Sequence, residues 1–161
     1  MRLPVNLLAE RYKDRLFAAA FAACGNRQDA EDAVQEAFIQ YHVTQEQYQD
    51  EQHIKAWLIR VAVNKAKDLC RSFWRRNKVS LDDYMETLEF GTPADESLFE
   101  AVMGLPQKYR IVLHLYYYED YSTAEIAENL GLNENTVRTR LSRARGMLKK
   151  ILKEEWEDDK Q

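Results

Sequence analysis

The residues best suited to chemistry lie together in the last third of the chain, and that chemistry is hydrogen bonding to nucleic acid. One predicted helix carries amide, hydroxyl and guanidinium groups that match base edges and phosphates: Asn135, Arg138, Thr139, Arg140, Ser142, Arg143 and Arg145. At about 100° per residue, four of them point away from the apolar side: Asn135, Thr139, Ser142 and Arg143. Arg138 and Arg145 share one flank, and Arg140 lies on the other.

Two short helices joined by a tight turn are predicted to position these side chains. Ser122 and Glu125 have the spacing of a capping box, and Gly131 can adopt the left-handed conformation that ends a helix. Asn133 is a suitable N-cap for the second helix. The buried side of that helix follows from its apolar period: Val137, Leu141, Ala144 and Leu148. This pattern predicts a helix-turn-helix, which places its second helix in the major groove of DNA.

The charge pattern favours DNA contact over a merely solvated helix. No acidic residue occurs between Thr136 and Leu148, so we expect the arginines there to be unpaired. The chain of 161 residues has a net charge of -4, but its charges are segregated. Residues 53–78 hold eight bases and one acid, whereas residues 79–100 hold seven acids and no base. Two basic surfaces separated by an acidic segment are therefore predicted.

The composition predicts an all-helical chain and argues against several classes of protein. Only 5 glycines and 3 prolines interrupt the sequence. No apolar run approaches the roughly 20 residues of a membrane span, and the start lacks a secretory signal, so we expect a cytoplasmic location. Cys24 and Cys70 are predicted to be small core residues. No metal-ligand spacing, phosphate loop or catalytic pairing is present, so we expect no metal, no cofactor and no enzyme activity.

An acidic stretch is predicted to divide the chain into two helical domains. The predicted boundaries are a first unit at 1–78, an extended acidic linker at 79–96, a second unit at 97–155 and an acidic tail at 156–161. In the first unit, Gly25 and Asn26 end one helix and a second opens at Asp29. A polar loop, roughly 43–52, then leads to a long helix at about 54–76.

The long helix is predicted to carry a second DNA-binding face. Arg60, Asn64, Lys67 and Arg71 recur at i, i+4, i+7 and i+11, a polar and cationic stripe suited to following a phosphate backbone. The buried side is expected to hold Ile54, Trp57, Leu58, Val61, Ala62, Leu69 and Phe73, with Trp57 as a core anchor. In the second unit, alternate members of the tyrosine run 116–118 are expected in the core, and Tyr117 is assigned no function.

Three segments in this order resemble the extracytoplasmic-function (ECF) group of bacterial RNA polymerase sigma factors. Residues 29–38 resemble the segment that binds core polymerase, and residues 57–68 resemble the reader of the minus-ten promoter element. Residues 105–119, with 125–127 and 136–145, resemble the minus-thirty-five reader. The resemblance implies a sigma region 2 bundle and a sigma region 4 helix-turn-helix, and a transcription initiation factor without catalysis of its own.

The resemblance also implies roles for single residues. Those matching the core polymerase-binding segment are Asp29, Asp32, Gln35, Glu36 and Phe38. Asn64 matches a position that lines the pocket for a flipped-out promoter base, and the loop around Tyr48 would form its other wall. With Arg60, Lys67 and Arg71, these residues make the predicted minus-ten site. Groove-facing positions of the minus-thirty-five helix match Arg138, Thr139, Ser142 and Arg143. The implied partners are core RNA polymerase, promoter DNA and a separate anti-sigma factor, which can be membrane-bound.

Two other interpretations remain open from the sequence. An autonomous helix-turn-helix regulator would bind duplex DNA tightly without polymerase. An all-helical adaptor protein would have basic faces that are only solvated, and it would show neither affinity for DNA nor a steep dependence on salt.

Overall fold

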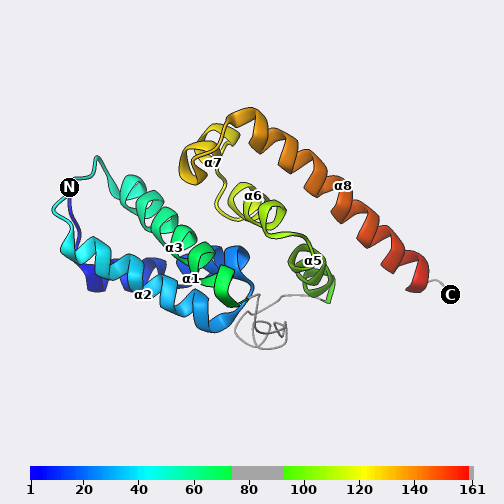
Figure 1. Cartoon of the computed structure of the whole chain (residues 1–161), viewed down its shortest axis with the longest axis horizontal. Helices are drawn as coiled ribbons and strands as arrows, with labels where there is room; N and C mark the ends of the chain where they lie inside the picture. Colours follow the sequence, from blue (N-terminus) through cyan, green and yellow to red (C-terminus); the bar gives the residue numbers. More distant parts are fainter. Residues whose placement is uncertain (74–92, 160–161) are drawn as a thin grey trace. The chain divides into compact units, whose positions relative to one another are not determined.

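The computed structural model describes the backbone of residues 1–73 and 93–159, and the side chains of 1–71 and 98–153. In these ranges every regular element is an α-helix, which confirms the all-α prediction (Figure 1). The helices are α1 (Val5–Cys24), α2 (Arg27–Val43), α3 (Glu51–Phe73), α5 (Pro93–Met103), α6 (Gln107–Tyr117), α7 (Thr123–Leu130) and α8 (Glu134–Asp159). The chain divides into two compact units, Met1–Val79 and Ser80–Gln161, each with its own core.

Unit 1 is a bundle in which α1, α2 and α3 each pack against the other two (Figure 1). Gly25 ends α1 with a φ of 74°, a left-handed conformation that glycine adopts without strain. The side chain of Asn26 then accepts a hydrogen bond from the Asp29 backbone N–H and caps α2. Gly25 and Asn26 separate the two helices as predicted, and α2 begins at Arg27, two residues before the predicted start at Asp29.

The buried side of α3 is rotated from the predicted one. Trp57, Val61 and Leu69 are only half-buried, whereas Ile59, Val63, Ala66 and Cys70 are almost completely enclosed. The prediction was wrong here because α3 packs between two helices rather than against one. Its buried arc is therefore wider, and it is centred on residues that the single-face pattern had omitted. Ile54, Leu58 and Ala62 are fully buried, as predicted.

The two cysteines are core residues, as expected. Cys24 and Cys70 are buried and form no disulfide. The Cys70 thiol donates to the Cys24 carbonyl oxygen at 3.2 Å, so it joins α3 to the end of α1. Their role in unit 1 is packing and local hydrogen bonding.

Unit 2 is built around α8, which contacts α5, α6 and α7. The helix α5 begins at Pro93, earlier than the start expected near residue 97, and proline's fixed φ suits a first helical position. Residues 79–92 of the predicted linker lie outside the described residues, as do 74–76 of the predicted long helix. The helix α8 continues to Asp159, into the predicted tail, and 160–161 lie outside the description.

The core of unit 2 confirms the predicted buried side of the second helix of the helix-turn-helix. Val137, Leu141 and Ala144 are fully buried and Leu148 is half-buried. They meet a core that comes from the three preceding helices and includes Phe99, Ile111, Val112, Leu115 and Ile126. The same helix can therefore present its opposite side to solvent.

The tyrosine run departs from the prediction. Tyr117 and Tyr118 are 55% and 63% exposed, and Tyr116 is half-buried. The core positions of α6 are filled by aliphatic residues one turn earlier, so the tyrosines at its end project past the core. The expectation that alternate members of the run are core residues was wrong.

Candidate nucleic-acid interface

The helix-turn-helix has the local structure that its sequence predicts. The Ser122 hydroxyl accepts a hydrogen bond from the Glu125 backbone N–H, and the Glu125 carboxylate accepts one from the Ser122 N–H. Gly131 ends α7 with a φ of 67°. The Asn133 side chain accepts a hydrogen bond from the Asn135 N–H at 2.7 Å and opens α8. The caps satisfy backbone groups at both ends of the turn and fix how α8 leaves α7.

The outer side of α8 presents the predicted DNA-binding residues to solvent. Six of the seven are exposed: Asn135, Arg138, Thr139, Ser142, Arg143 and Arg145. Arg140 is half-buried, on the flank where the wheel had placed it. Short polar groups thus occupy the front of the helix and guanidinium groups occupy both sides, the arrangement needed to read base edges while holding phosphates.

The arginines of α8 are not all unpaired, which corrects the sequence-based expectation. Arg138 Nη2 lies 2.8 Å from Glu134 Oε1, and Arg138 Nη1 donates to Asn135 Oδ1 at 3.2 Å. Glu134 lies just outside the segment that has no acidic residue. It precedes Arg138 by four residues, about one helical turn, so the two side chains meet on the same side of the helix. An i, i+4 pair of this kind contributes only about 0.2–0.5 kcal/mol, so DNA can displace it.

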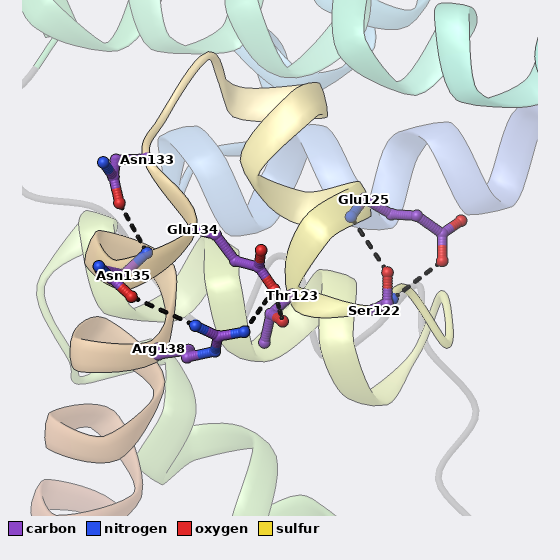
Figure 2. A network of polar contacts seen from close by, with 7 residues as sticks. All are labelled: Ser122, Thr123, Glu125, Asn133, Glu134, Asn135 and Arg138. Atoms are coloured by element: carbon purple, nitrogen blue, oxygen red, sulfur yellow. Dashed lines mark hydrogen bonds and ion pairs between the residues drawn. The ribbon is translucent and has the colours of Figure 1, made fainter.

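The carboxylate of Glu134 also joins the two helices of the motif. Glu134 Oε1 accepts a second hydrogen bond, from Thr123 Oγ1 at the first residue of α7, at 2.8 Å. Figure 2 shows Thr123, Glu134 and Arg138 meeting between the N-terminal ends of α7 and α8. The recognition helix is thus tied to its neighbour at the end that would enter the groove.

Arg145 is held by the tyrosines that the sequence had left without a function. Its Nε donates to the Tyr117 hydroxyl at 2.8 Å, and its guanidinium lies 5.1 Å from the ring centre of Tyr116. The hydrogen bond to Tyr117 raises the pKa of Arg145, so its charge is fixed. Tyr116 and Tyr117 therefore hold Arg145 beside the outer face of α8. The i to i+28 separation of this pair gives no local pattern by which sequence could reveal it.

In unit 1, the predicted stripe on α3 lies on the side opposite its buried arc. Arg60, Asn64 and Arg71 are exposed, and Lys67 is half-buried. The basic stripe runs along the helix away from α1 and α2, as the i, i+4, i+7, i+11 spacing predicted. It offers three cations and one amide to a strand of nucleic acid.

The loop between α2 and α3 is held by buried aromatic rings. Tyr48 is only 4% exposed, stacks on Tyr41 with ring centres 5.7 Å apart, and meets the edge of Trp57 at 5.9 Å. Burial raises the pKa of Tyr48, so its hydroxyl stays neutral. The ring of Tyr48 is therefore enclosed in the protein, although Tyr48 was among the predicted minus-ten residues and the loop around it was predicted to form a pocket wall. It fixes the loop whose neighbouring residues are exposed, among them Gln47 and Gln49.

Residues at the beginning of the chain hold the same loop and were missed by the sequence analysis. Arg2 donates to the backbone oxygens of Glu46 and Tyr41 at 2.9 and 2.8 Å, and its guanidinium lies 4.5 Å from the Tyr41 ring centre. The Tyr41 hydroxyl exchanges hydrogen bonds with the backbone of Leu3. The Tyr48 N–H donates to the Met1 carbonyl oxygen at 3.2 Å. Residues 1–3 thus pair with the loop.

The start of α3 fixes the other end of the loop. Asp50 accepts a hydrogen bond from the His53 N–H at 2.8 Å and acts as the N-cap. Glu51, in the first turn, accepts a hydrogen bond from the Tyr12 hydroxyl at 2.7 Å and forms an ion pair with Arg11. Tyr12 and Arg11 both lie on α1. The bonds from Tyr12 and Arg11 lower the pKa of Glu51.

The residues predicted to bind core polymerase are spread over three sides of α2. Asp32, Gln35 and Glu36 lie on the outer side, together with the exposed apolar side chains of Ile39 and Val43. Phe38 and Asp29 are half-buried on opposite flanks. The Asp29 carboxylate also accepts from the Asn26 side chain at 2.8 Å, so it supports the cap of α2. Ile39 and Val43 were missed, although their spacing from Gln35 places them on the same side.

Neither a metal cluster nor a membrane span is found in the described residues. In these parts of the chain, no group of three or more His, Cys, Asp or Glu side chains is placed to hold a metal ion. None of the described helices combines the length and the apolar character of a membrane span.

The geometry is that of an all-helical DNA-binding class of protein, in which one unit carries a helix-turn-helix and the other carries a basic helix. Comparison with known families gives Sigma-70 region 2 over residues 8–76 and Sigma-70, region 4 over residues 95–148. The chain is 35% identical to the RNA polymerase sigma factor SigV of Bacillus subtilis, over 83% of this chain and 81% of that protein. It is 32% identical to the ECF RNA polymerase sigma-E factor of Haemophilus influenzae, over 89% and 84% of the two chains.

Solved structures agree on the fold. The sigma factor RpoE of Bartonella quintana, in complex with the anti-sigma factor NepR, matches with a TM-score of 0.72 and 22% identity, over 92% of this chain and 96% of that one. CnrH, in complex with the cytosolic domain of CnrY, matches with a TM-score of 0.65 and 25% identity, over 92% and 87%.

The chain belongs to the ECF family of RNA polymerase sigma factors. It is therefore a transcription initiation factor that directs RNA polymerase to promoters, and not an enzyme. The autonomous regulator is not favoured. The chain carries region 2 followed by region 4, and a regulator that acts without polymerase would not need region 2.

Proposed function

We propose that α8 reads the duplex minus-thirty-five element. Asn135, Thr139, Ser142 and Arg143 face base edges, and Arg138, Arg140 and Arg145 flank them toward base edges or phosphates. The observation that carries this assignment is the exposure of these polar side chains on the side opposite the buried Val137, Leu141 and Ala144. A helix that binds in the major groove needs a polar side that contacts DNA and an apolar side that packs on the rest of its domain.

The minus-ten element is assigned to α3 and the loop that precedes it. Arg60, Lys67 and Arg71 follow the backbone of the melted strand, and Asn64 pairs with the edge of an extruded base. Extruding a base costs a few kcal/mol, which stacking and phosphate contacts can offset. Tyr48 contributes by holding the loop, and exposed neighbours such as Gln47 and Gln49 form the surface that meets the base.

The outer side of α2 is assigned to docking on core polymerase. Asp32, Gln35 and Glu36 supply hydrogen-bond acceptors and donors, and exposed Ile39 and Val43 add apolar area that a partner would bury. Phe38 and Asp29 lie at the edges of this surface. The chain acts in the cytoplasm, where promoter DNA and polymerase are.

An anti-sigma factor is a further proposed partner. Both solved relatives were captured with a second protein, and in the Bartonella quintana complex that protein is the anti-sigma factor NepR. A regulator that covers the docking side of α2 or the outer side of α8 would keep the protein from polymerase or from DNA.

One experiment tests the assignment of the two surfaces together. Core polymerase with the wild-type chain is used to select promoters from a genomic library by transcription in vitro. Asn64→Ala is expected to retain recruitment and to lose open-complex formation, whereas Arg143→Ala is expected to lose recruitment. An absence of any new start site with the wild-type chain would refute the proposed function. Tight duplex binding without polymerase would instead support the autonomous regulator.

A further inference from the structure

The carboxylate of Glu134 lies in an unexpected place for a DNA-binding surface. It is the first residue of α8, at the end of the helix proposed to enter the groove, and its side chain remains 39% exposed. A negative charge there repels phosphates. Its presence needs an explanation beyond helix capping, which Asn133 already supplies.

One oxygen atom of this carboxylate makes all of its observed contacts. Glu134 Oε1 accepts from Thr123 Oγ1 and from Arg138 Nη2, each at 2.8 Å. In Figure 2, Arg138 turns back toward the start of α8, with its guanidinium between Glu134 and Asn135. In the free protein Arg138 is therefore paired with a carboxylate that also accepts a hydrogen bond from α7.

The consequence differs between the two kinds of DNA complex. Non-specific binding depends on how many phosphates the protein neutralises, and a cation already paired adds little to that number. In a specific complex, an arginine can instead bind a guanine edge through two hydrogen bonds, which favours leaving an exposed ion pair. The pair thus weakens binding to arbitrary DNA more than binding to the correct sequence.

We propose that Glu134 is a specificity-determining residue, which restrains Arg138 so that the recognition helix discriminates its sequence from other DNA. The inference rests on the proposed reading of the minus-thirty-five element by α8. Glu134 acts through Arg138 and is a positioning residue, not a base contact. Thr123 also donates to this carboxylate, but the charge of Glu134, and not its bond to α7, is what restrains Arg138.

The test compares Glu134→Gln with a matched control, Glu128→Gln. The first keeps an amide oxygen for Thr123 and Arg138 but removes the charge. The second removes the same charge from an exposed glutamate of α7. Each variant is assembled with core polymerase. Binding is measured to the duplex that the wild-type holoenzyme selects from a randomised library and to a scrambled duplex, over a range of salt concentrations, with core polymerase alone as the baseline.

For Glu134→Gln we expect affinity for scrambled duplex to rise about 3- to 10-fold at 0.1 M salt. The substitution removes a charge that repels phosphates, and it frees Arg138 for one further phosphate contact, which steepens the salt slope by about 0.9. Affinity for the selected duplex should rise less than about 2-fold, so the specific to non-specific ratio falls. Glu128→Gln should leave that ratio unchanged. Thr123→Val, which keeps the carboxylate, should hold the ratio close to wild type.

Three results would overturn the inference. Glu134→Gln could behave like Glu128→Gln, it could weaken binding to both duplexes equally, or Thr123→Val could lower the ratio as much as Glu134→Gln does. The last two results would make the side chain a structural tie between α7 and α8. A wild-type holoenzyme that shows no preference between the duplexes would instead refute the proposed function.

Discussion

The two proposed DNA-binding surfaces are held in place by different means. In unit 1, the loop before α3 rests on Tyr48, Tyr41 and Trp57, rings that are buried or half-buried, and is covered by residues 1–3. In unit 2, the start of α8 is set by polar contacts among Thr123, Glu134 and Arg138, of which one is part-buried and one exposed. The loop is therefore an extension of a core, whereas the recognition helix has side chains that can exchange partners.

This difference fits what each surface is proposed to do. A loop that captures an extruded base gains from a shape formed in advance, because no ordering entropy is then lost on binding. A helix that searches duplex DNA gains from polar side chains whose present partners are weak. Changes to the aromatic support of the loop in unit 1 should thus appear mainly as lost stability, and changes on the outer side of α8 mainly as lost DNA binding.

The largest effect is expected from truncating the ring beneath the loop. Tyr41 is 1% exposed and supports Tyr48, so Tyr41→Ala should destabilise unit 1 by about 3–5 kcal/mol. Tyr41→Phe keeps the ring and loses only the bonds to Leu3, so it should cost about 1 kcal/mol. Urea unfolding measures both. Equal costs for the two variants would show that the ring does not anchor the loop.

A pH-dependent effect is expected in unit 2, where His114 is half-buried with its imidazole Nε2 enclosed, and this burial lowers the pKa of His114 to about 4. The folded state holds this imidazole neutral, so stability is fully present above the unfolded pKa of about 6.5 and is lost as the pH falls toward 4. Each unit of pKa difference between the folded and unfolded states corresponds to about 1.36 kcal/mol. Because part of the residue remains accessible, we expect unit 2 to lose about 2–3 kcal/mol of unfolding free energy, less than the full pKa difference would give.

The unfolding free energy of unit 2, followed between pH 7.5 and 4.5, measures this effect. His114→Phe should flatten the pH dependence, because it removes a group that binds its proton mainly in the unfolded state. An unchanged pH profile in His114→Phe would contradict the assignment.

The main effect on α8 is expected in binding and not in stability. Arg143 is exposed and has no ionic partner among the residues whose side chains are described. Arg143→Ala should cost about 1–3 kcal/mol on the cognate minus-thirty-five duplex and less on scrambled DNA. Its thermal unfolding should match wild type. Equal losses on both sequences would make Arg143 a phosphate contact.

An intermediate loss of stability is expected when the contacts between residues 1–3 and the loop are removed. Arg2→Ala removes two hydrogen bonds to backbone oxygens and the contact with the Tyr41 ring, so we expect a loss of about 1–2 kcal/mol in unit 1. Open-complex formation should fall while minus-thirty-five binding stays unchanged. Lys13→Ala, at an exposed cation of α1, serves as the charge control. Normal open-complex formation in Arg2→Ala would separate residues 1–3 from the minus-ten site.

The smallest effect is expected at the exposed cap of α7. Ser122→Ala removes the hydroxyl of the capping box and should cost about 1 kcal/mol of unit 2 stability. Ser142→Ala, on the outer side of α8, should leave stability unchanged. If Ser122→Ala cost more stability than Tyr41→Ala, polar contacts would contribute more than buried rings, which is the opposite of the expected order.

The sequence predicted what depends on local pattern. The caps at Ser122, Gly131 and Asn133 involve residues within a few positions, and the outer face of α8 follows from its period. Contacts between distant segments could not be read in this way. Arg2 with Tyr41, and Tyr117 with Arg145, meet only after the helices have packed.

Burial on α3 shows a related limit. The pattern indicated one apolar side, but packing between two helices selected Ile59, Val63 and Ala66 as well. Tyr48 was assigned to the minus-ten site because the resemblance implies that the loop around it forms a wall of the base pocket. The structure instead encloses its ring against Tyr41, a contact that no local rule reveals.

Two separately anchored surfaces are proposed to grip different parts of one promoter. The most direct test follows minus-thirty-five protection and the permanganate reactivity of unpaired thymines on a single promoter bound by holoenzyme. Asn64→Ala should keep the protection and lose the reactive thymines, whereas Arg143→Ala should lose the protection first. If both variants reduce both signals to the same extent, the two surfaces do not act separately and the account is wrong.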